Sequence, residues 1–152
     1  MEELDLGVLL GLAYNQFVAE LHERLGDEGF MHLKSTFGFA FKVLARERLT
    51  TSELAARLGI TPQGAAKTVE EMVAAGYVER TPDPADRRLK RLALTERCRS
   101  LLAVAHEFHV DFERQLSAEL GAERTAALRE VLDAIVDRAE SADGLARAVR
   151  QI

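Results

Sequence analysis

The chain has 152 residues, of which 47% are hydrophobic and 30% charged; this is enough for one well-cored domain and excludes a disordered protein. No apolar run approaches the roughly 20 residues that a membrane-spanning helix needs, and the acidic start MEELDLGVLL is unlike a signal peptide. One cysteine, Cys98, excludes an internal disulfide and fits a reducing compartment, so we expect a soluble cytoplasmic protein.

The net charge of −5 is unevenly distributed along the chain. Residues 1–49 hold five Lys/Arg and eight Asp/Glu, a balance of −3, and residues 100–152 hold six and ten, a balance of −4. Residues 50–99 hold nine and seven, a balance of +2. Because salt screens charges more than about 8–10 Å apart, the acidic ends do not exclude nucleic-acid binding by the positive middle third.

Two amphipathic helices are predicted ahead of that middle third. The first covers about residues 5–26, with Asp5 as N-cap, and glycines at 26 and 29 are expected to end it. Its apolar residues, mostly three or four positions apart, are Leu6, Leu9, Leu12, Ala13, Phe17, Leu21 and Leu25. The second is predicted over about residues 32–46, with Leu33, Phe37, Ala40, Phe41, Val43 and Leu44 as its apolar positions.

The middle third opens with two short helices joined at a glycine. Thr50 and Glu53 form a capping box, which predicts a helix that runs to about Leu58. Gly59 is expected to end this helix.

The next helix is predicted from Thr61 to about Ala75. Thr61 is its expected N-cap, and Pro62 occupies the first helical position, where a missing N–H costs nothing. Gly76 is expected to end it, and its buried side is predicted to consist of Ala65, Val69 and Met72.

A β-hairpin is predicted next. Tyr77–Arg80 and Arg91–Leu94 have the composition of short strands, and the segment TPDPADRR between them has the prolines and polar residues of a loop. Two short helices followed by a basic hairpin are the order of a helix-turn-helix with a β-wing, a unit that binds DNA. The predicted fold class is therefore mainly α with a small β-wing.

Long helices follow the wing. Thr95 is expected to start a helix over about residues 96–119, and Gly121 separates it from another over about 122–140. Residues 143–151 are expected to add a last turn or two. The apolar stripe of the second long helix consists of Leu128, Val131, Leu132, Ile135 and Val136. One winged unit is too small to cover these helices and the first one, so a second copy of the chain is expected to bury them.

Taken together, these residues resemble the MarR family of bacterial winged-helix regulators over essentially the whole chain. The resemblance rests on LTTSELAARLGIT at 49–61, on Ala75 to Arg80, on DPADRRLKR at 83–91 and on Leu94-Thr95. It implies a homodimer, a palindromic operator and often a small-molecule pocket between the dimerisation and DNA-binding parts.

The resemblance also implies a division of the chain. Residues 1–152 are expected to form a single MarR-like domain. Residues 32–95 would be its winged helix-turn-helix part, and 1–30 and 96–152 its dimerisation helices. We expect a repressor, because covering a promoter usually represses it.

The predicted base-reading residues lie in the first turns of the second short helix, the part that reaches base edges in such units. Thr61, Gln63 and Lys67 are its exposed polar members, with Thr68 and Pro62 beside them. Glutamine suits adenine, threonine suits a phosphate or a thymine methyl, and lysine suits guanine or phosphate. A cap and solvated charges are the alternative interpretation.

Two further features bear on this helix. Its residues 64–66, Gly-Ala-Ala, supply few hydrogen bonds and leave room for indirect readout. Ser52, near the start of the preceding helix, is a candidate phosphate donor.

The wing supplies the other candidate DNA contacts. By resemblance, Arg88 enters the minor groove, with Arg87 beside it and Asp86 orienting an arginine through a salt bridge. Lys90 and Arg91 on the returning strand suit phosphate contacts. The alternative is a solvated run of charges.

A small-molecule site is predicted around the first two helices. By resemblance, Tyr14, Phe17, His32, Phe37 and Phe41 would form a pocket for a small aromatic or lipophilic effector. The competing interpretation is that these aromatic residues are ordinary core at helical spacing.

Four other interpretations compete with that of a DNA-binding regulator. Cys98 would be the thiol of a redox-sensing regulator, but an inert packing cysteine is favoured. His106 and His109 are three residues apart without a defined third metal ligand, so neither metal nor cofactor is expected. There is no nucleophile motif or phosphate-binding loop, so we predict no enzyme. A winged helix that binds protein remains the competing class.

Overall fold

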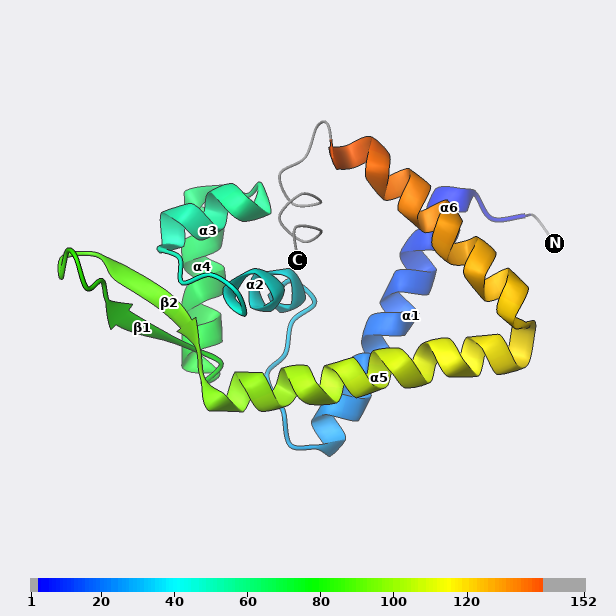
Figure 1. The fold of residues 1–152 in the computed structure, drawn as a ribbon, viewed down its shortest axis with the longest axis horizontal. Coiled ribbons are helices and arrows are strands. Elements are labelled where there is room, and N and C mark those ends of the chain that lie inside the picture. The colour runs from blue at the N-terminus through cyan, green and yellow to red at the C-terminus, as the bar shows by residue number, and fades with distance from the viewer. Residues whose placement is uncertain (1–2, 141–152) are drawn as a thin grey trace.

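The computed structural model describes residues 3–140, with side chains to residue 138. Its elements in chain order are α1 (Leu6–Asp27), α2 (Phe37–Leu44), α3 (Thr51–Leu58), α4 (Pro62–Ala74), β1 (Val78–Pro82), β2 (Lys90–Leu94), α5 (Glu96–Leu120) and α6 (Ala122–Glu140). This mainly helical fold with a two-stranded wing agrees with the predicted class (Figure 1). Within the described residues, no helix is long and apolar enough to cross a membrane. The predicted turn over 143–151 lies outside them.

The helix-turn-helix is set by its caps, as the sequence predicted. The Thr50 hydroxyl accepts a hydrogen bond from the Glu53 N–H at 3.2 Å, and the Glu53 carboxylate accepts one from the Thr50 N–H at 3.0 Å. Gly59 has φ +66°, a left-handed conformation that a glycine adopts at little cost, and it ends α3. Thr61 then caps α4 by accepting a hydrogen bond from the Gly64 N–H at 3.0 Å.

The wing is an antiparallel pair in which Val78 is opposite Leu94 and Pro82 is opposite Lys90. β1 therefore begins one residue later and ends two residues later than predicted. A proline fits here because it lies at the end of an edge strand, where its missing N–H breaks no ladder. Leu92 also bridges to Leu49, so the wing is attached to the chain just before α3.

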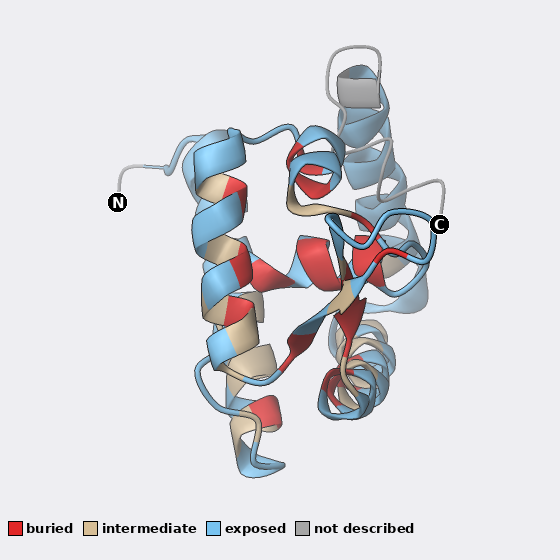
Figure 2. Cartoon of the chain, turned by 90° about the vertical axis from the view of Figure 1, so that its left-hand side faces the viewer, coloured by how far each residue is buried: buried red, intermediate tan, exposed pale blue. Residues whose placement is uncertain are grey.

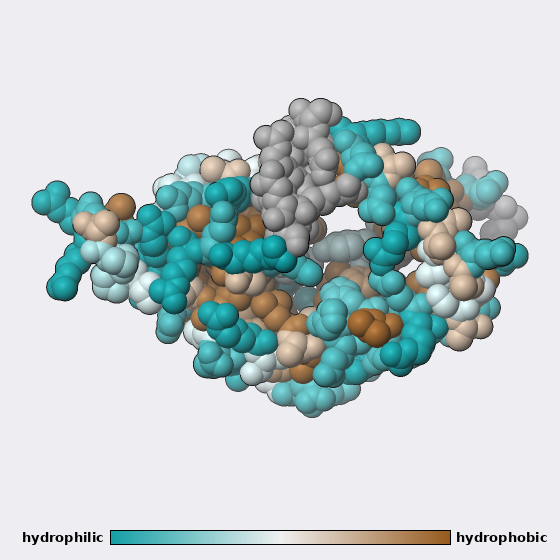
Figure 3. All heavy atoms as spheres, in the orientation of Figure 1, coloured by the Kyte–Doolittle hydropathy of each residue, from teal (hydrophilic) through white to brown (hydrophobic). Residues whose placement is uncertain are grey.

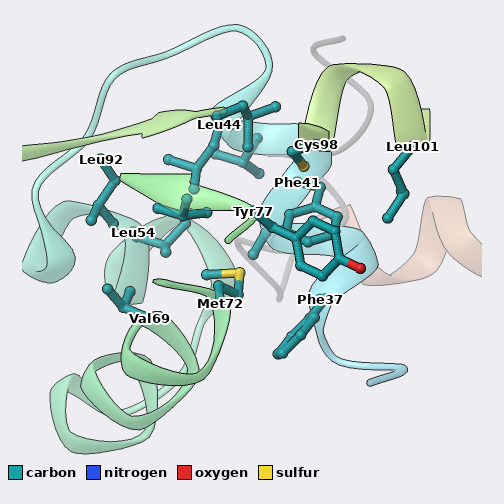
Figure 4. Close-up of a cluster of buried hydrophobic side chains, with 14 of the residues drawn as sticks. Phe37, Phe41, Leu44, Leu54, Val69, Met72, Tyr77, Leu92, Cys98 and Leu101 are labelled. Atoms are coloured by element: carbon teal, nitrogen blue, oxygen red, sulfur yellow. The ribbon is translucent and has the colours of Figure 1, made fainter. Parts of the chain in front are cut away.

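The main hydrophobic core lies under the helix-turn-helix and continues to the start of α5. Leu54, Val69, Met72, Tyr77 and Leu92 are fully buried there, and Figure 4 shows them gathered with Phe41 and Cys98. Figure 2 shows buried residues on the inward faces of these helices and of the wing. This core makes the winged unit a firm platform for its exposed face.

The second helix is shorter than predicted, because α2 starts at Phe37 and not near residue 32. His32 has φ +58°, which a right-handed helix cannot contain. The carbonyl of Met31 is also occupied, because it accepts a hydrogen bond from the Tyr77 hydroxyl at 2.6 Å. Residues 28–36 therefore form a connector between α1 and α2. The first helix ends one residue later than predicted, and Asp5 stands at its N-cap without a side-chain hydrogen bond.

Outside the winged unit, α1 crosses the long α5, and α6 turns back from the far end of α5 at Gly121 (Figure 1). Phe17 packs against Phe108 and Phe112 with ring centroids 5.5 and 5.0 Å apart, and Arg24 pairs with Asp111 at 3.2 Å. Large apolar side chains nevertheless stay exposed on α1 and α6: Leu6, Leu9, Leu12, Leu128, Val131, Leu132, Ile135 and Val136.

Candidate nucleic-acid interface

The first turns of α4 present the predicted polar residues to solvent. Gln63 and Lys67 are exposed and four residues apart, so they share one face of the helix. Ala65, Val69 and Met72 are fully buried beneath them. The structure thus brings Gln63 and Lys67 together above a rigid support.

The other candidate DNA contacts near this face differ in their exposure and in whether their polar groups already have hydrogen-bond partners. Thr61 uses its hydroxyl as the cap of α4, and Thr68 is half-buried, so both have less to offer a base than Gln63. Pro62 and Ser52 are exposed. A Cβ added at Gly64 would lie 3.1 Å from the Thr61 hydroxyl, so the small residue there protects the cap.

The tip of the wing is a tight turn that presents two arginines. The Leu89 N–H donates to the Asp86 carbonyl at 3.0 Å, which places Arg87 and Arg88 at the two corner positions. Both are exposed, and within the described residues neither guanidinium has an ion pair. Figure 3 shows hydrophilic side chains reaching out from the projecting wing. Their charges are therefore available to a polyanion.

Asp83 organises this turn, a role that the sequence analysis missed. Its carboxylate is buried at 5% exposure and accepts hydrogen bonds from the Ala85 N–H at 2.7 Å and the Asp86 N–H at 3.0 Å. The Arg91 guanidinium also donates to it. The Arg91 bond and these two backbone bonds hold the pKa of Asp83 below its usual value. The available signal was Asp83-Pro84, a turn-forming pair eight residues before an arginine on the returning strand.

Arg91, a predicted phosphate contact, has several hydrogen-bond partners within the protein. Besides pairing with Asp83, its Nη1 donates to the Glu53 carboxylate at 3.1 Å and to the Arg48 carbonyl at 3.0 Å. The hydrogen bond that Arg91 donates to the Asp83 carboxylate is the largest reason that the pKa of Arg91 is raised. Arg91 therefore ties the wing to the start of α3, and its charge is already paired with two carboxylates.

Asp86 also differs from its predicted role. In the part of the chain that the structure describes it makes no ion pair with an arginine; its carboxylate accepts a hydrogen bond from the Arg88 N–H at 3.0 Å. It fixes the backbone of Arg88 and not the guanidinium. Lys90 is exposed at the start of β2, next to the tip, as a phosphate contact requires.

The five predicted ligand-site residues do not line one cavity. Phe37 and Phe41 are buried in the main core, where Phe41 packs on Tyr77 with ring centroids 5.7 Å apart. This agrees with the alternative interpretation of ordinary core. His32 and Tyr14 are exposed, and Phe17 lines a cavity beside α1.

That cavity has a volume of about 310 Å³ and lies between α1, α5 and α6. Its apolar wall consists of Phe17, Phe112, Leu116, Leu128 and Leu132, and the ion pair of Arg129 with Glu113 lies at its edge. His109 stacks on Phe17 with ring centroids 5.4 Å apart. Burial lowers the pKa of His109, and the neighbouring Lys42 and His106 lower it further.

Cys98 is packed in the core with no exposed surface. Burial raises the pKa of its thiol to about 12, in spite of the opposing charge of Arg99. A protonated, inaccessible thiol is a poor nucleophile, which supports the packing interpretation over redox sensing. The described residues hold no group of three His, Cys, Asp or Glu that could hold a metal ion.

Comparison with known proteins agrees with this geometry. The model of the MarR family matches residues 41–89, which run from α2 to the wing tip. No curated protein matches the chain.

Solved structures match over most of the chain. The reduced form of MarR from E. coli is 24% identical, with a TM-score of 0.67 over 89% of this chain and 98% of that one. The transcriptional regulator Tm0710 from Thermotoga maritima is also 24% identical, with a TM-score of 0.56 over 89% and 94%. A mutant E. coli MarR complexed with operator DNA is 22% identical, with a TM-score of 0.64 over 86% and 92%. The winged segment thus matches the model of the MarR family, and the described residues share the fold of these solved structures.

Proposed function

We propose that the protein is a transcriptional regulator that binds operator DNA through α4 and the wing. The observation that carries this proposal is the wing tip, where Arg87 and Arg88 lie in a fixed turn and make no ion pair with any side chain that the structure describes. Arginine in a narrow minor groove is favoured by the groove's negative potential. The exposed Gln63 and Lys67 suit base edges in the neighbouring major groove.

The site residues divide into contacts and supports. Arg88, Arg87 and Lys90 contact the minor groove and phosphates, and Ser52 donates to a phosphate. Asp83, Asp86 and Arg91 hold the wing in shape. A titration series with a genomic promoter fragment at increasing salt tests this proposal, because neutralising phosphates makes affinity fall steeply with salt. A protein that binds no promoter fragment would instead be the competing class, a winged helix that binds protein.

The regulator acts as a homodimer on a palindrome. The exposed apolar residues of α1 and α6 need a cover, and a two-fold copy of the same helices provides one while setting two α4 helices on successive half-sites. We assign residues 32–95 to DNA binding, and 1–30 and 96–152 to dimerisation through α1, α5 and α6. The double variant Val131→Asp/Ile135→Asp, which places charges on that stripe, should be monomeric in light scattering and lose operator binding. A stable dimer of this variant would contradict the assignment.

Repression and release by a small effector complete the proposal. Occupying a promoter represses it, and such a regulator works in the cytoplasm. The cavity beside Phe17 supports an apolar effector, because its walls are largely aliphatic and aromatic and its volume of about 310 Å³ suits a small molecule. Leu116→Trp, which lies on α5 outside the apolar stripe of α6, fills it. A panel of lipophilic compounds should yield ligands that release operator DNA from the wild type but not from this variant; release that Leu116→Trp leaves unchanged would place the site elsewhere.

A further inference from the structure

The connector, residues 28–36, is fastened to the corner where α4 ends and the wing begins. It joins α1, an arm of the proposed dimer, to the winged unit. Three separate contacts hold it there, made by Tyr77, Arg97 and Lys34.

Tyr77 is the centre of this corner. It has no exposed surface, and its hydroxyl donates to the Met31 carbonyl at 2.6 Å. Its N–H donates to the Met72 carbonyl at 3.0 Å, and its carbonyl accepts from the Thr95 N–H at 3.1 Å. One residue therefore joins the end of α4, the start of α5 and the connector.

Arg97 adds a second fastening from α5. Its Nη2 donates to the Gly29 carbonyl at 3.2 Å. Its guanidinium carbon lies 5.4 Å from the centroid of the Tyr77 ring and 5.7 Å from that of Phe30, within the range of cation–π contacts. Arg97 thus contacts the connector at the Gly29 carbonyl and at the Phe30 ring.

The third fastening reaches α4 itself. Lys34 pairs with Glu71 at 2.7 Å, near the C-terminal end of that helix. Between Met31 and Lys34, His32 keeps a left-handed backbone at φ +58°. A histidine in that region is held there by its surroundings, which indicates that the connector has one imposed conformation.

These contacts lie at the C-terminal end of α4, so a small tilt there displaces the first turn at the other end of the helix. α4 has 13 residues, so at about 1.5 Å per residue it is roughly 20 Å long. A tilt of about 5° around its C-terminal corner would move its first turn, with Gln63, by about 1.7 Å. That shift exceeds the tolerance of a hydrogen bond to a base.

We infer that Tyr77 and Arg97 are positioning residues that fix the direction of α4 relative to α1 and α5, and so select the half-site separation that the dimer accepts. This inference rests on the proposed function, because it concerns two recognition helices on one palindrome. Neither residue touches DNA; each acts through the placement of α4.

Two mild variants test the inference. Tyr77→Phe keeps the ring and removes the hydroxyl, and Arg97→Met keeps the stem and removes the guanidinium. Arg99→Met is the matched control, since Arg99 is exposed two residues further on and its ion pair with Glu96 is long, 3.8 Å. Each protein is titrated with an operator selected by the wild type and with copies in which one or two base pairs are added or removed between the half-sites.

The wild type and Arg99→Met should prefer the original separation strongly. Tyr77→Phe and Arg97→Met should lose about three- to tenfold affinity for that separation and less than twofold for the others, so that the preference flattens. The preference is a ratio within one protein preparation, so a smaller folded fraction does not affect it. If a variant loses affinity equally for every half-site separation, or keeps the affinities of the wild type, the inference is wrong while the proposed function stands. A wild type that binds none of these fragments contradicts the proposed function, and the inference with it.

Discussion

Removing the carboxylate of Asp83 separates two effects that act in opposite directions on DNA binding. An acidic group beside a DNA-binding wing repels phosphates, so charge alone predicts that its loss strengthens binding. The structure predicts the reverse, because Asp83 holds the turn that presents Arg87 and Arg88. Asp83→Ala should therefore weaken operator binding.

The size of the loss follows from the backbone that Asp83 orders. Fixing one residue costs about 1–2 kcal/mol, so a tip in which the two arginine residues became free would have to be ordered again on DNA at about 2–4 kcal/mol. Since about 1.4 kcal/mol is a factor of ten in affinity, the smaller of these two costs corresponds to roughly thirtyfold. Residual order in the hairpin makes the real cost smaller than that of two fully free residues, so we expect a loss of about ten- to thirtyfold.

The variant Asp83→Asn separates the two contributions of Asp83, its backbone hydrogen bonds and its ion pair with Arg91. Its amide oxygen can still accept from the Ala85 and Asp86 N–H groups, but the ion pair with Arg91 is lost. We expect a smaller loss, about three- to tenfold. Glu79→Gln is the control for charge, because Glu79 is exposed on β1 of the same hairpin. Fluorescence anisotropy with a labelled operator at fixed salt measures all three. Binding by Asp83→Ala as tight as that of Glu79→Gln would refute the role given to Asp83.

Other predictions concern single groups. Gln63→Ala should weaken operator binding by about five- to a hundredfold and relax selection at one base position; site selection in which every position stays equally strict would exclude a direct base contact. Burial lowers the pKa of His22 and His109 in the folded state, so the unfolded chain binds more protons below about pH 6.5 and stability should fall as pH falls through that range; His109→Gln should flatten part of this fall in urea unfolding. Peroxide should release no more operator from the wild type than from Cys98→Ser, and release from the wild type alone would revive the redox alternative.

Much of the winged unit could be predicted because its signals are local. The capping box of Thr50 and Glu53, the cap at Thr61 and the stop at Gly59 each involve residues within three positions of one another. Such contacts depend on the neighbouring sequence more than on the rest of the fold.

The errors came from contacts between distant parts of the chain. The connector departs from a helix at His32, next to the Met31 carbonyl that accepts a hydrogen bond from Tyr77, 46 residues further on. Arg91 is engaged by Glu53, 38 residues away, so a basic run in the sequence did not reveal which cation is free. Helical spacing likewise showed that Phe17, Phe37 and Phe41 are apolar positions. It did not show that Phe17 packs against α5 while Phe37 and Phe41 lie in the main core.

The central claim is that the wing tip places Arg88 on operator DNA. The most direct test titrates wild type and Arg88→Ala with the same operator fragment at one salt concentration, with light scattering to compare their assembly and melting to compare their stability. The exposed position of Arg88 predicts unchanged assembly and melting together with the loss of most operator affinity. Equal affinity of the two proteins for the operator would contradict the claim.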